Sequence, residues 1–312
     1  MSHITSSLAG VFALLCVSPA LPAGQIYWTD KGDRMPGIYR GDMDGAGEYE
    51  VLLDEDNGMI EPRGLGLDLD GGRIYWTDAG SGKIQRADLD GKAVEDLVVT
   101  GNVFLADIEL DLRAGKMYWS DTGLGAIRSA DLNGDNVADV RTSLNAPYYL
   151  ELTESHIYWA ELDNSVIHRM NRDGSGAVVD VVTGQDRVRD MRVDPAGNMI
   201  YWNDRDLHVV RRAPLDGGST QTLYAFPSPQ EGKPHGMNLD LDAGMIYWTD
   251  TRRDLKWVAR GSIDGSTAYE VLYDGLDDPW DIELVVPEPS TLVLAIAGLI
   301  GMFAFGCWRR KR

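Results

Sequence analysis

The sequence predicts an all-β fold in which one unit of four short antiparallel strands is repeated six times. A Tyr-Trp pair recurs six times, a short alternating apolar run precedes all but the first pair, and an Asp-Gly or Asn-Gly turn follows each. Units of four strands with a period of roughly 40 to 48 residues form the blades of a β-propeller. One blade cannot bury both of its faces, whereas six blades in a ring bury one another.

The Tyr-Trp pairs mark the expected second strand of each unit. They begin at Tyr27, Tyr75, Tyr118, Tyr158, Tyr201 and Tyr247, and they use six of the nine tryptophans. These large rigid side chains would pack each blade on its neighbour. The acidic residue two places after the Trp would hold the adjoining loop by accepting backbone N–H bonds. The fourth unit departs from the pattern, because Ala160-Glu161 replaces the usual hydroxyl or amide residue and Asp.

The other strands are placed around these pairs. A first strand is expected about ten residues earlier, as at 64–68 and 107–111. The third strand ends in a tight hairpin, as at Asp90-Gly91, since both positions tolerate positive φ. An apolar run such as 94–99 closes the unit.

The strand count also predicts how the ring closes. The first Tyr-Trp pair has no first strand before it, whereas residues 279–285 form a first strand with no Tyr-Trp pair after it. Together they complete one blade from both ends of the domain. The result is a six-bladed propeller over residues 24–286.

These repeats resemble YWTD repeats, the low-density lipoprotein receptor class B type, over roughly residues 24–286. The resemblance implies ligand recognition and intramolecular contact rather than catalysis.

The two ends of the chain are expected to direct it to a membrane. Residues 1–23 contain a short apolar run followed by small residues, which is typical of a signal peptide, although no Lys or Arg precedes the run. Residues 287–312 form a tail with three parts: Pro287, Glu288 and Pro289 within the motif 286–290, an apolar segment at 291–308, and a basic end at 309–312. The apolar segment is long enough to cross a bilayer, and the basic end would stay cytoplasmic.

In this order, the three parts resemble a PEP-CTERM sorting signal. The resemblance implies processing by an exosortase-type enzyme in a Gram-negative-type bacterium. The domain would pass through the inner membrane, stay anchored for a time, and reach the cell surface or the exterior. The alternative is a plain membrane anchor that is never cut.

Composition excludes several classes of function. The chain has 29 Lys+Arg and 49 Asp+Glu, a formal net charge of −20, which argues against nucleic-acid binding. Its two cysteines, Cys16 and Cys307, lie in the end segments, so the domain between them can form neither a disulfide nor a Cys-based zinc site. The sequence also lacks a Gly-rich phosphate loop, Gly-x-Ser-x-Gly and His-Glu-x-x-His.

The first strands of the units would line a central channel. Period-two alternation sends one set of side chains to the blade interfaces: Leu65, Leu67, Ile108, Leu110, Leu150, Leu152, Met191, Val193, Met237, Leu239, Ile282 and Leu284. The opposite set forms two tiers, an upper one of Gly64, Asp107, Tyr149, Asp190, Gly236 and Asp281 and a lower one of Gly66, Glu109, Glu151, Arg192, Asn238 and Glu283. Carboxylates this close must share protons, pair with Arg192 or hold a cation.

One hypothesis is therefore a bound divalent metal, with calcium as the candidate. Its ligands would come from Asp107, Glu109, Glu151, Asp190, Asn238, Asp281 and Glu283. The alternative is a water-filled polar channel that solvates its own walls.

Two functions from different classes follow. As a binding module, the propeller would recognise a protein or glycan through Arg63, Tyr148, Arg189, His235 and Trp280, because aromatic and Arg side chains anchor interfaces. These residues would otherwise only plug the mouth of the channel. As an enzyme, it would use calcium held by Glu109, Glu151, Asn238 and Asp281 to activate water against lactones or esters. We favour binding, since the YWTD resemblance points to recognition.

Overall fold

The computed structural model describes residues 24–101, 104–162, 166–226, 232–252 and 256–287. The expected signal peptide at 1–23, Glu288, Pro289 and the apolar segment at 291–308 lie outside these residues. The compact unit comprises Gly24–Val286. Within the described ranges, no helix is long and apolar enough to cross a membrane.

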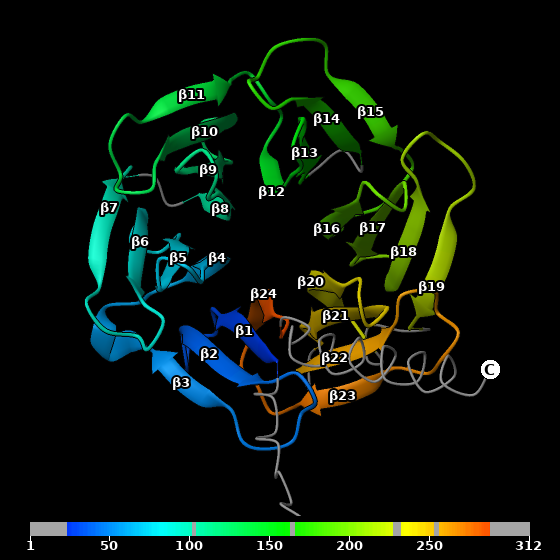
Figure 1. Ribbon diagram of the computed structural model, residues 1–312, viewed down its shortest axis with the longest axis horizontal. Coiled ribbons are helices and arrows are strands. Elements are labelled where there is room, and N and C mark those ends of the chain that lie inside the picture. Colours follow the sequence, from blue (N-terminus) through cyan, green and yellow to red (C-terminus); the bar gives the residue numbers. More distant parts are fainter. Residues whose placement is uncertain (1–23, 102–103, 163–165, 227–231, 253–255, 288–312) are drawn as a thin grey trace, which may run out of the picture. The chain divides into compact units, whose positions relative to one another are not determined.

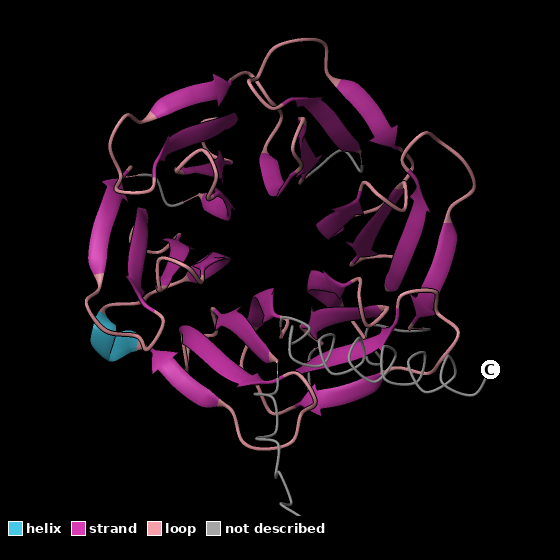
Figure 2. Cartoon of the chain, viewed as in Figure 1, coloured by secondary structure: helices cyan, strands magenta, loops and turns pink. Residues whose placement is uncertain are grey.

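The unit is a ring of six four-stranded antiparallel blades (Figure 1). From the innermost strand outwards, blade 1 contains β24 (Pro279–Val285), β1 (Gln25–Asp30), β2 (Gly37–Asp42) and β3 (Glu50–Leu53); blade 2 contains β4 (Pro62–Asp68), β5 (Arg73–Asp78), β6 (Lys83–Asp88) and β7 (Glu95–Val99); and blade 3 contains β8 (Leu105–Asp111), β9 (Lys116–Asp121), β10 (Ala126–Asp131) and β11 (Ala138–Arg141). Blade 4 contains β12 (Pro147–Leu152), β13 (His156–Glu161), β14 (Ile167–Asn171) and β15 (Val179–Val182); blade 5 contains β16 (Val188–Asp194), β17 (Met199–Asp204), β18 (Val209–Pro214) and β19 (Gln221–Ala225); and blade 6 contains β20 (Pro234–Asp240), β21 (Met245–Asp250), β22 (Trp257–Ser262) and β23 (Glu270–Tyr273). A short 3₁₀ helix, η1 (Glu55–Asn57), lies between blades 1 and 2 (Figure 2).

Blade 1 is assembled from both ends of the unit. β24 pairs antiparallel with β1, with Val285 opposite Gln25 and Ile282 opposite Trp28. The predicted ring closure and the predicted six blades are therefore confirmed.

The Tyr-Trp pairs build the interfaces between blades. Successive side chains of a strand point to opposite faces, so the Tyr packs toward the following blade and the Trp toward the preceding one. Tyr27 of blade 1 shares one core cluster with Trp76 of blade 2, and Tyr247 of blade 6 shares another with Trp28 of blade 1. All six of these tryptophans are at most 1% exposed. The predicted interface set of the inner strands is buried or half-buried in the same clusters.

In four of the six blades, a hydroxyl residue after the Tyr-Trp pair connects two blades. The Thr77 hydroxyl accepts the N–H of Gly64 in its own blade and donates to the carbonyl of Ala106 in the next, both at 3.0 Å. Thr29, Ser120 and Thr249 make the same two bonds. Ala160 in blade 4 has no hydroxyl to do so, which gives the irregular fourth repeat a structural consequence.

In blades 1 and 2, the acidic residue that ends the Tyr-Trp motif holds the loop before the inner strand. The Asp78 carboxylate accepts the N–H groups of Ile60, Glu61 and Ser81 at 3.0 to 3.1 Å. In blade 1, Asp30 accepts those of Gly32, Asp277 and Asp278. The predicted role of this residue is therefore confirmed.

Strand pairing defines two faces of the ring. The start of β4 lies opposite the end of β5, with Pro62 paired to Asp78. The loops before the inner strands and the loops from second to third strands therefore share one face. We call it the mouth face; it includes residues 31–36, 54–61, 122–125, 142–146, 183–187, 205–208 and 274–278. The opposite side is the base face.

Candidate functional site

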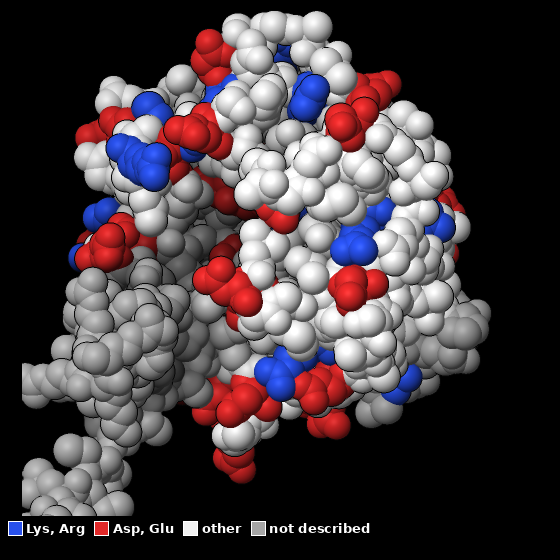
Figure 3. Space-filling model, turned by 45° about the vertical axis from the view of Figure 1, so that its right-hand side comes forward, with Lys and Arg blue, Asp and Glu red and all other residues white. Residues whose placement is uncertain are grey.

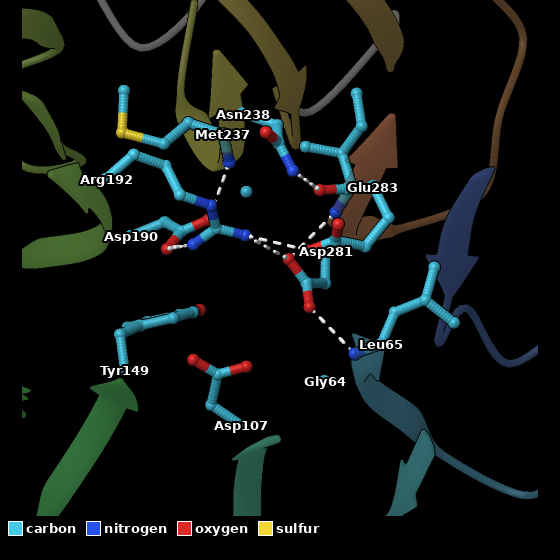
Figure 4. Close-up of polar contacts among 12 residues, drawn as sticks. Gly64, Leu65, Asp107, Tyr149, Asp190, Arg192, Met237, Asn238, Asp281 and Glu283 are labelled. Carbon is cyan, nitrogen blue, oxygen red and sulfur yellow. Dashed lines mark hydrogen bonds and ion pairs between the residues drawn. The ribbon is translucent and has the colours of Figure 1, made fainter. Parts of the chain in front are cut away.

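Three aspartates on alternate blades connect the inner strands around the ring. Asp107 accepts the N–H of Ile108 at 2.9 Å and that of Leu150, in the next blade, at 2.8 Å. Asp190 likewise accepts Met191 and Met237, and Asp281 accepts Ile282 and Leu65. Figure 4 shows the bonds of Asp190 and Asp281 across the blade boundaries. Each carboxylate thus ties one blade to the next.

Glycine allows close approach of the blades between these aspartates. A Cβ on Gly64 would lie 2.5 Å from the Ile108 nitrogen, and one on Gly236 would lie 2.2 Å from the Trp280 oxygen. The upper tier predicted from the sequence is therefore a ring that connects the blades. Its three Asp residues alternate with Gly64, Tyr149 and Gly236.

Arg192 supplies a positive charge to the carboxylates at the centre. Its Nη1 lies 2.9 Å from Asp190 Oδ1, and its Nη2 lies 3.2 Å from Glu283 Oε1 and 3.8 Å from Asp281 Oδ1. Its Nε lies 3.8 Å from Glu151 Oε2. The guanidinium points into the ring between strands β16 and β24 (Figure 4). We call these residues, with Asp107, Glu109 and Asn238, the channel cluster.

The channel cluster contains six carboxyl groups and one arginine. Burial raises the pKa of Glu283 to about 8 and that of Glu151 to about 7, although Arg192 opposes both shifts. Burial also raises the pKa values of Asp107 and Glu109 well above their usual range, with further increases from Asp281 and Glu151 respectively. Some of these groups therefore carry protons near neutral pH, as expected of buried like charges.

The arrangement disfavours a calcium ion at the aspartates and the asparagine of the channel cluster. Both oxygens of Asp107, Asp190 and Asp281 already accept backbone N–H bonds, and the Asn238 amide donates to the Ile282 carbonyl. Among the residues that the structure describes, no group of three or more His, Cys, Asp or Glu side chains is arranged to hold a metal. Arg192 provides the positive charge that calcium would supply.

The five residues expected to contact a ligand lie together at the mouth-face end of the inner strands. The His235 and Trp280 ring centroids are 3.7 Å apart, and the Tyr149 hydroxyl lies 3.2 Å from the His235 ring nitrogens. The guanidinium carbons of Arg63 and Arg189 lie 6.0 and 5.5 Å from the Tyr148 ring centroid.

These side chains form a largely buried layer. Arg189 is 5% exposed, Tyr148 6%, Trp280 7% and His235 0%. Arg63 is held by Glu61 at 2.7 Å and by the Leu105 carbonyl at 3.2 Å. The layer thus caps the channel cluster and offers a ligand only the edges of its rings and guanidinium groups.

Two further cations belong to this layer and were missed from the sequence. The Lys31 Nζ lies 4.3 Å from the Trp280 ring centroid. Arg205 lies close enough that Arg189, after burial, lowers its pKa. Both residues directly follow the acidic residue of their Tyr-Trp motif, on loops rather than inner strands. A basic residue directly after the motif acid could therefore have predicted both of them from the sequence. We call the seven residues Arg63, Tyr148, Arg189, His235, Trp280, Lys31 and Arg205 the mouth cluster.

The electrostatics of the mouth cluster are cationic. Burial lowers the pKa of His235 well below its usual range, and Arg189, Arg205 and Lys31 lower it further. His235 is therefore neutral at physiological pH. The positive charge of the cluster resides on its arginines and Lys31.

The ring and its motifs define a six-bladed propeller of the YWTD kind. Residues 72–108 match the family model of the low-density lipoprotein receptor repeat class B, and residues 285–311 match that of the PEP-CTERM protein-sorting motif. The chain thus carries a class B (YWTD) repeat and a PEP-CTERM motif, as the sequence analysis expected.

Curated relatives match parts of the chain. Protein cueball of Drosophila sechellia is 28% identical over 121 residues, which are 39% of this chain and 18% of that protein. Vitellogenin receptor Yl of Drosophila melanogaster is 29% identical over 132 residues, 42% of this chain and 6% of the receptor. The matched part of the chain therefore spans less than a fifth of the length of these relatives.

Solved structures share the fold. A chain of the crystal structure of a nidogen/laminin complex is similar with a TM-score of 0.71 and 16% identity, over 85% of this chain and 100% of that chain. At this level of identity the similarity shows the fold alone.

Proposed function

We propose that the chain is an exported binding protein whose propeller recognises a partner protein through the mouth face. The observation that carries this proposal is the mouth cluster, where aromatic rings and arginines gather around the axis of the ring. Such side chains dominate the affinity of protein interfaces. The relatives are consistent with it. One is named as a vitellogenin receptor, and a chain with the same fold comes from the structure of a nidogen/laminin complex.

The PEP-CTERM motif supports a route for export. Such a motif implies recognition by an exosortase-type enzyme and export in a Gram-negative bacterium. The finer parts of the proposal are anchoring through residues 291–308, cleavage near Pro287, and release at the cell surface. The geometry favours the hydrolase alternative less, because three of its four candidate ligands are already engaged. Asp281 accepts the N–H groups of Ile282 and Leu65. Glu151 accepts that of Val193, and the Asn238 amide donates to the Ile282 carbonyl.

The binding proposal is tested by photo-crosslinking in the native cell. A photoreactive residue replaces Leu207 on the mouth face or, as the matched control, Leu241 on the base face; these side chains are 40% and 49% exposed. We expect one protein to crosslink from position 207 and not from 241, and to be lost when Trp280→Ala is added. The same protein crosslinking equally from both positions would contradict the proposal.

The export proposal is tested separately. Cell fractionation and intact mass should show an extracellular or surface form that ends near Pro287. Replacing Pro287 and Glu288 with Ala should retain the full-length chain in the membrane fraction. A cytoplasmic wild-type chain would overturn this part of the proposal and leave the binding part intact.

A further inference from the structure

We propose that the mouth cluster binds a carboxylate of the partner protein, presented on an Asp or Glu side chain and held by Arg189 and Arg205. This inference rests on the proposed function and names the chemistry that the partner must supply. It is carried by two neighbouring guanidinium groups that make no ion pair with the described acidic residues.

Arg189 is the first of these groups. Its side chain is 5% exposed, and its buried Nε has no hydrogen-bond partner among the residues that the structure describes. Within the described part of the chain, its guanidinium has a cation–π contact with Tyr148, at 5.5 Å from the ring centroid, and no ion pair. Burying a charge without a counter-ion is unfavourable. An incoming anion would therefore gain a charge-assisted bond that the free protein lacks.

Arg205 is the second. Among the described residues its Nε also has no hydrogen-bond partner. Burial and Arg189 lower the pKa of Arg205, and Tyr149, Asp206 and Asp278 oppose this shift only in part. The two guanidinium groups thus repel each other in the free protein. A single carboxylate between them would relieve this repulsion, and the planar fork of Arg matches its two oxygens.

Neighbouring cations of the mouth cluster, by contrast, have acidic partners. In the same mouth cluster, Arg63 pairs with Glu61 at 2.7 Å and Lys31 with Asp278 at 3.0 Å. On the outer strands, Arg86 pairs with Glu95 at 2.7 Å. The space-filling view shows many Lys and Arg side chains beside Asp or Glu (Figure 3).

The surroundings favour a single carboxylate over a polyanion. The chain has a net charge of −20, and the acidic channel cluster lies directly beneath the mouth cluster, so a highly charged ligand would be repelled. Apolar side chains are exposed on the loops of the same face, with Ile60 at 58%, Leu124 at 62% and Leu207 at 40%. Exposed apolar side chains on the same face as charged anchors suit a protein surface better than a polysaccharide.

Phage display of random peptides against the full-length chain in detergent tests the proposal. Selected peptides are retained for analysis when their binding is lost in the Trp280→Ala variant. We expect these mouth-binding peptides to share an Asp or Glu, and its change to Asn or Gln to weaken binding roughly tenfold to a hundredfold, as for other charge-assisted bonds. The same peptide change should have little further effect on the double variant Arg189→Gln/Arg205→Gln.

A matched control and the opposing outcomes complete the test. Arg113→Gln, at an exposed arginine on the base face, should leave peptide affinity unchanged. Mouth-binding peptides that lack a required acidic residue would overturn the carboxylate inference while leaving the proposed function in place. Peptides that never depend on Trp280 would overturn both. A last outcome would also overturn the inference. If no peptide binds but oligogalacturonate does, and its binding needs Arg189 and Arg205, then the ligand carboxylate belongs to a glycan and not to a protein.

Discussion

At the residue scale, one small hydroxyl side chain joins neighbouring blades at four of the six blade boundaries. The hydroxyl of Thr249 accepts the Gly236 N–H and donates to the Trp280 carbonyl, both at 2.8 Å. All three residues are buried at the junction of blades 6 and 1, next to the mouth cluster. This hydroxyl therefore couples the stability of the ring to the position of Trp280.

The first prediction concerns this hydroxyl. Thr249→Val keeps the shape of the side chain and removes both bonds, so a buried N–H and a buried carbonyl lose a partner. We expect the free energy of unfolding to fall by about 1–3 kcal/mol, measured by chemical denaturation. Thr251→Val is the control, since its hydroxyl makes one long bond of 3.5 Å to the Lys233 carbonyl and should matter less. Equal losses in the two variants would contradict the coupling role.

Residue roles differed in how far the sequence could predict them. Alternation along the inner strands correctly placed the channel-facing and interface-facing side chains, because a strand leaves only two choices. The loop-holding role of Asp78 and its counterparts followed from its hydrogen-bonding chemistry. Two features depend on contacts between blades, which no single repeat encodes. One is the carbonyl in the next blade to which the motif hydroxyl donates. The other is that Arg189 makes no ion pair with the described residues.

At the element scale, β24 is the strand that turns an open array of blades into a ring. Ile282 is fully buried in the cluster shared by blades 6 and 1, and Asp281 bonds onward to Leu65 of blade 2. Without β24, blade 1 would lose its innermost strand and Trp28 would lose a packing partner.

The second prediction follows from this dependence. A chain that ends at Asp278 should lack the cooperative thermal unfolding that a chain ending at Val286 shows by calorimetry. A synthetic peptide of residues 279–286, added in trans, should restore it, because β24 contributes through contacts rather than through its connection. The same peptide with Ile282→Asp serves as the control and should not restore it. Cooperative unfolding of the shorter chain alone would refute the closing role.

The order of the elements was predictable because the repeat is strong and the strand count leaves an incomplete blade at each end, with three strands at the N-terminal side and one at the C-terminal side. The short helix η1 was not predicted. It depends on Asp54, whose side chain accepts the N–H of Asp56, and on Gly58 in the left-handed conformation at its end.

At the scale of the whole molecule, buried acids make the ring sensitive to pH. Burial raises the pKa values of Glu151 and Asp250 to about 7 and that of Glu283 to about 8. Between about pH 4.5 and pH 8, the folded chain retains protons that the unfolded chain has released. Folding stability contributed by these groups therefore decreases as pH rises through this window and levels off above it.

The third prediction is that the melting temperature is higher near pH 5 than near pH 8.5. Glu283→Gln should reduce this difference, since the amide stays neutral at both pH values and resembles the protonated acid. Glu48→Gln, at an exposed position, should keep the wild-type pH dependence. A melting temperature that rises steadily from pH 5 to pH 8.5 would rule out protonated acids in the channel cluster.

The path of β24 has a mechanical consequence. The strand runs from Trp280 at the mouth face to Val285 at the base face, where Gln25 pairs beside it. A force applied between a partner bound at the mouth face and the chain that follows Val285 would act along the length of β24. Its hydrogen bonds to β1 are perpendicular to the strand, so this tension loads them together in shear instead of peeling them one at a time. The strand that completes the ring is thus also the one oriented to carry force through it.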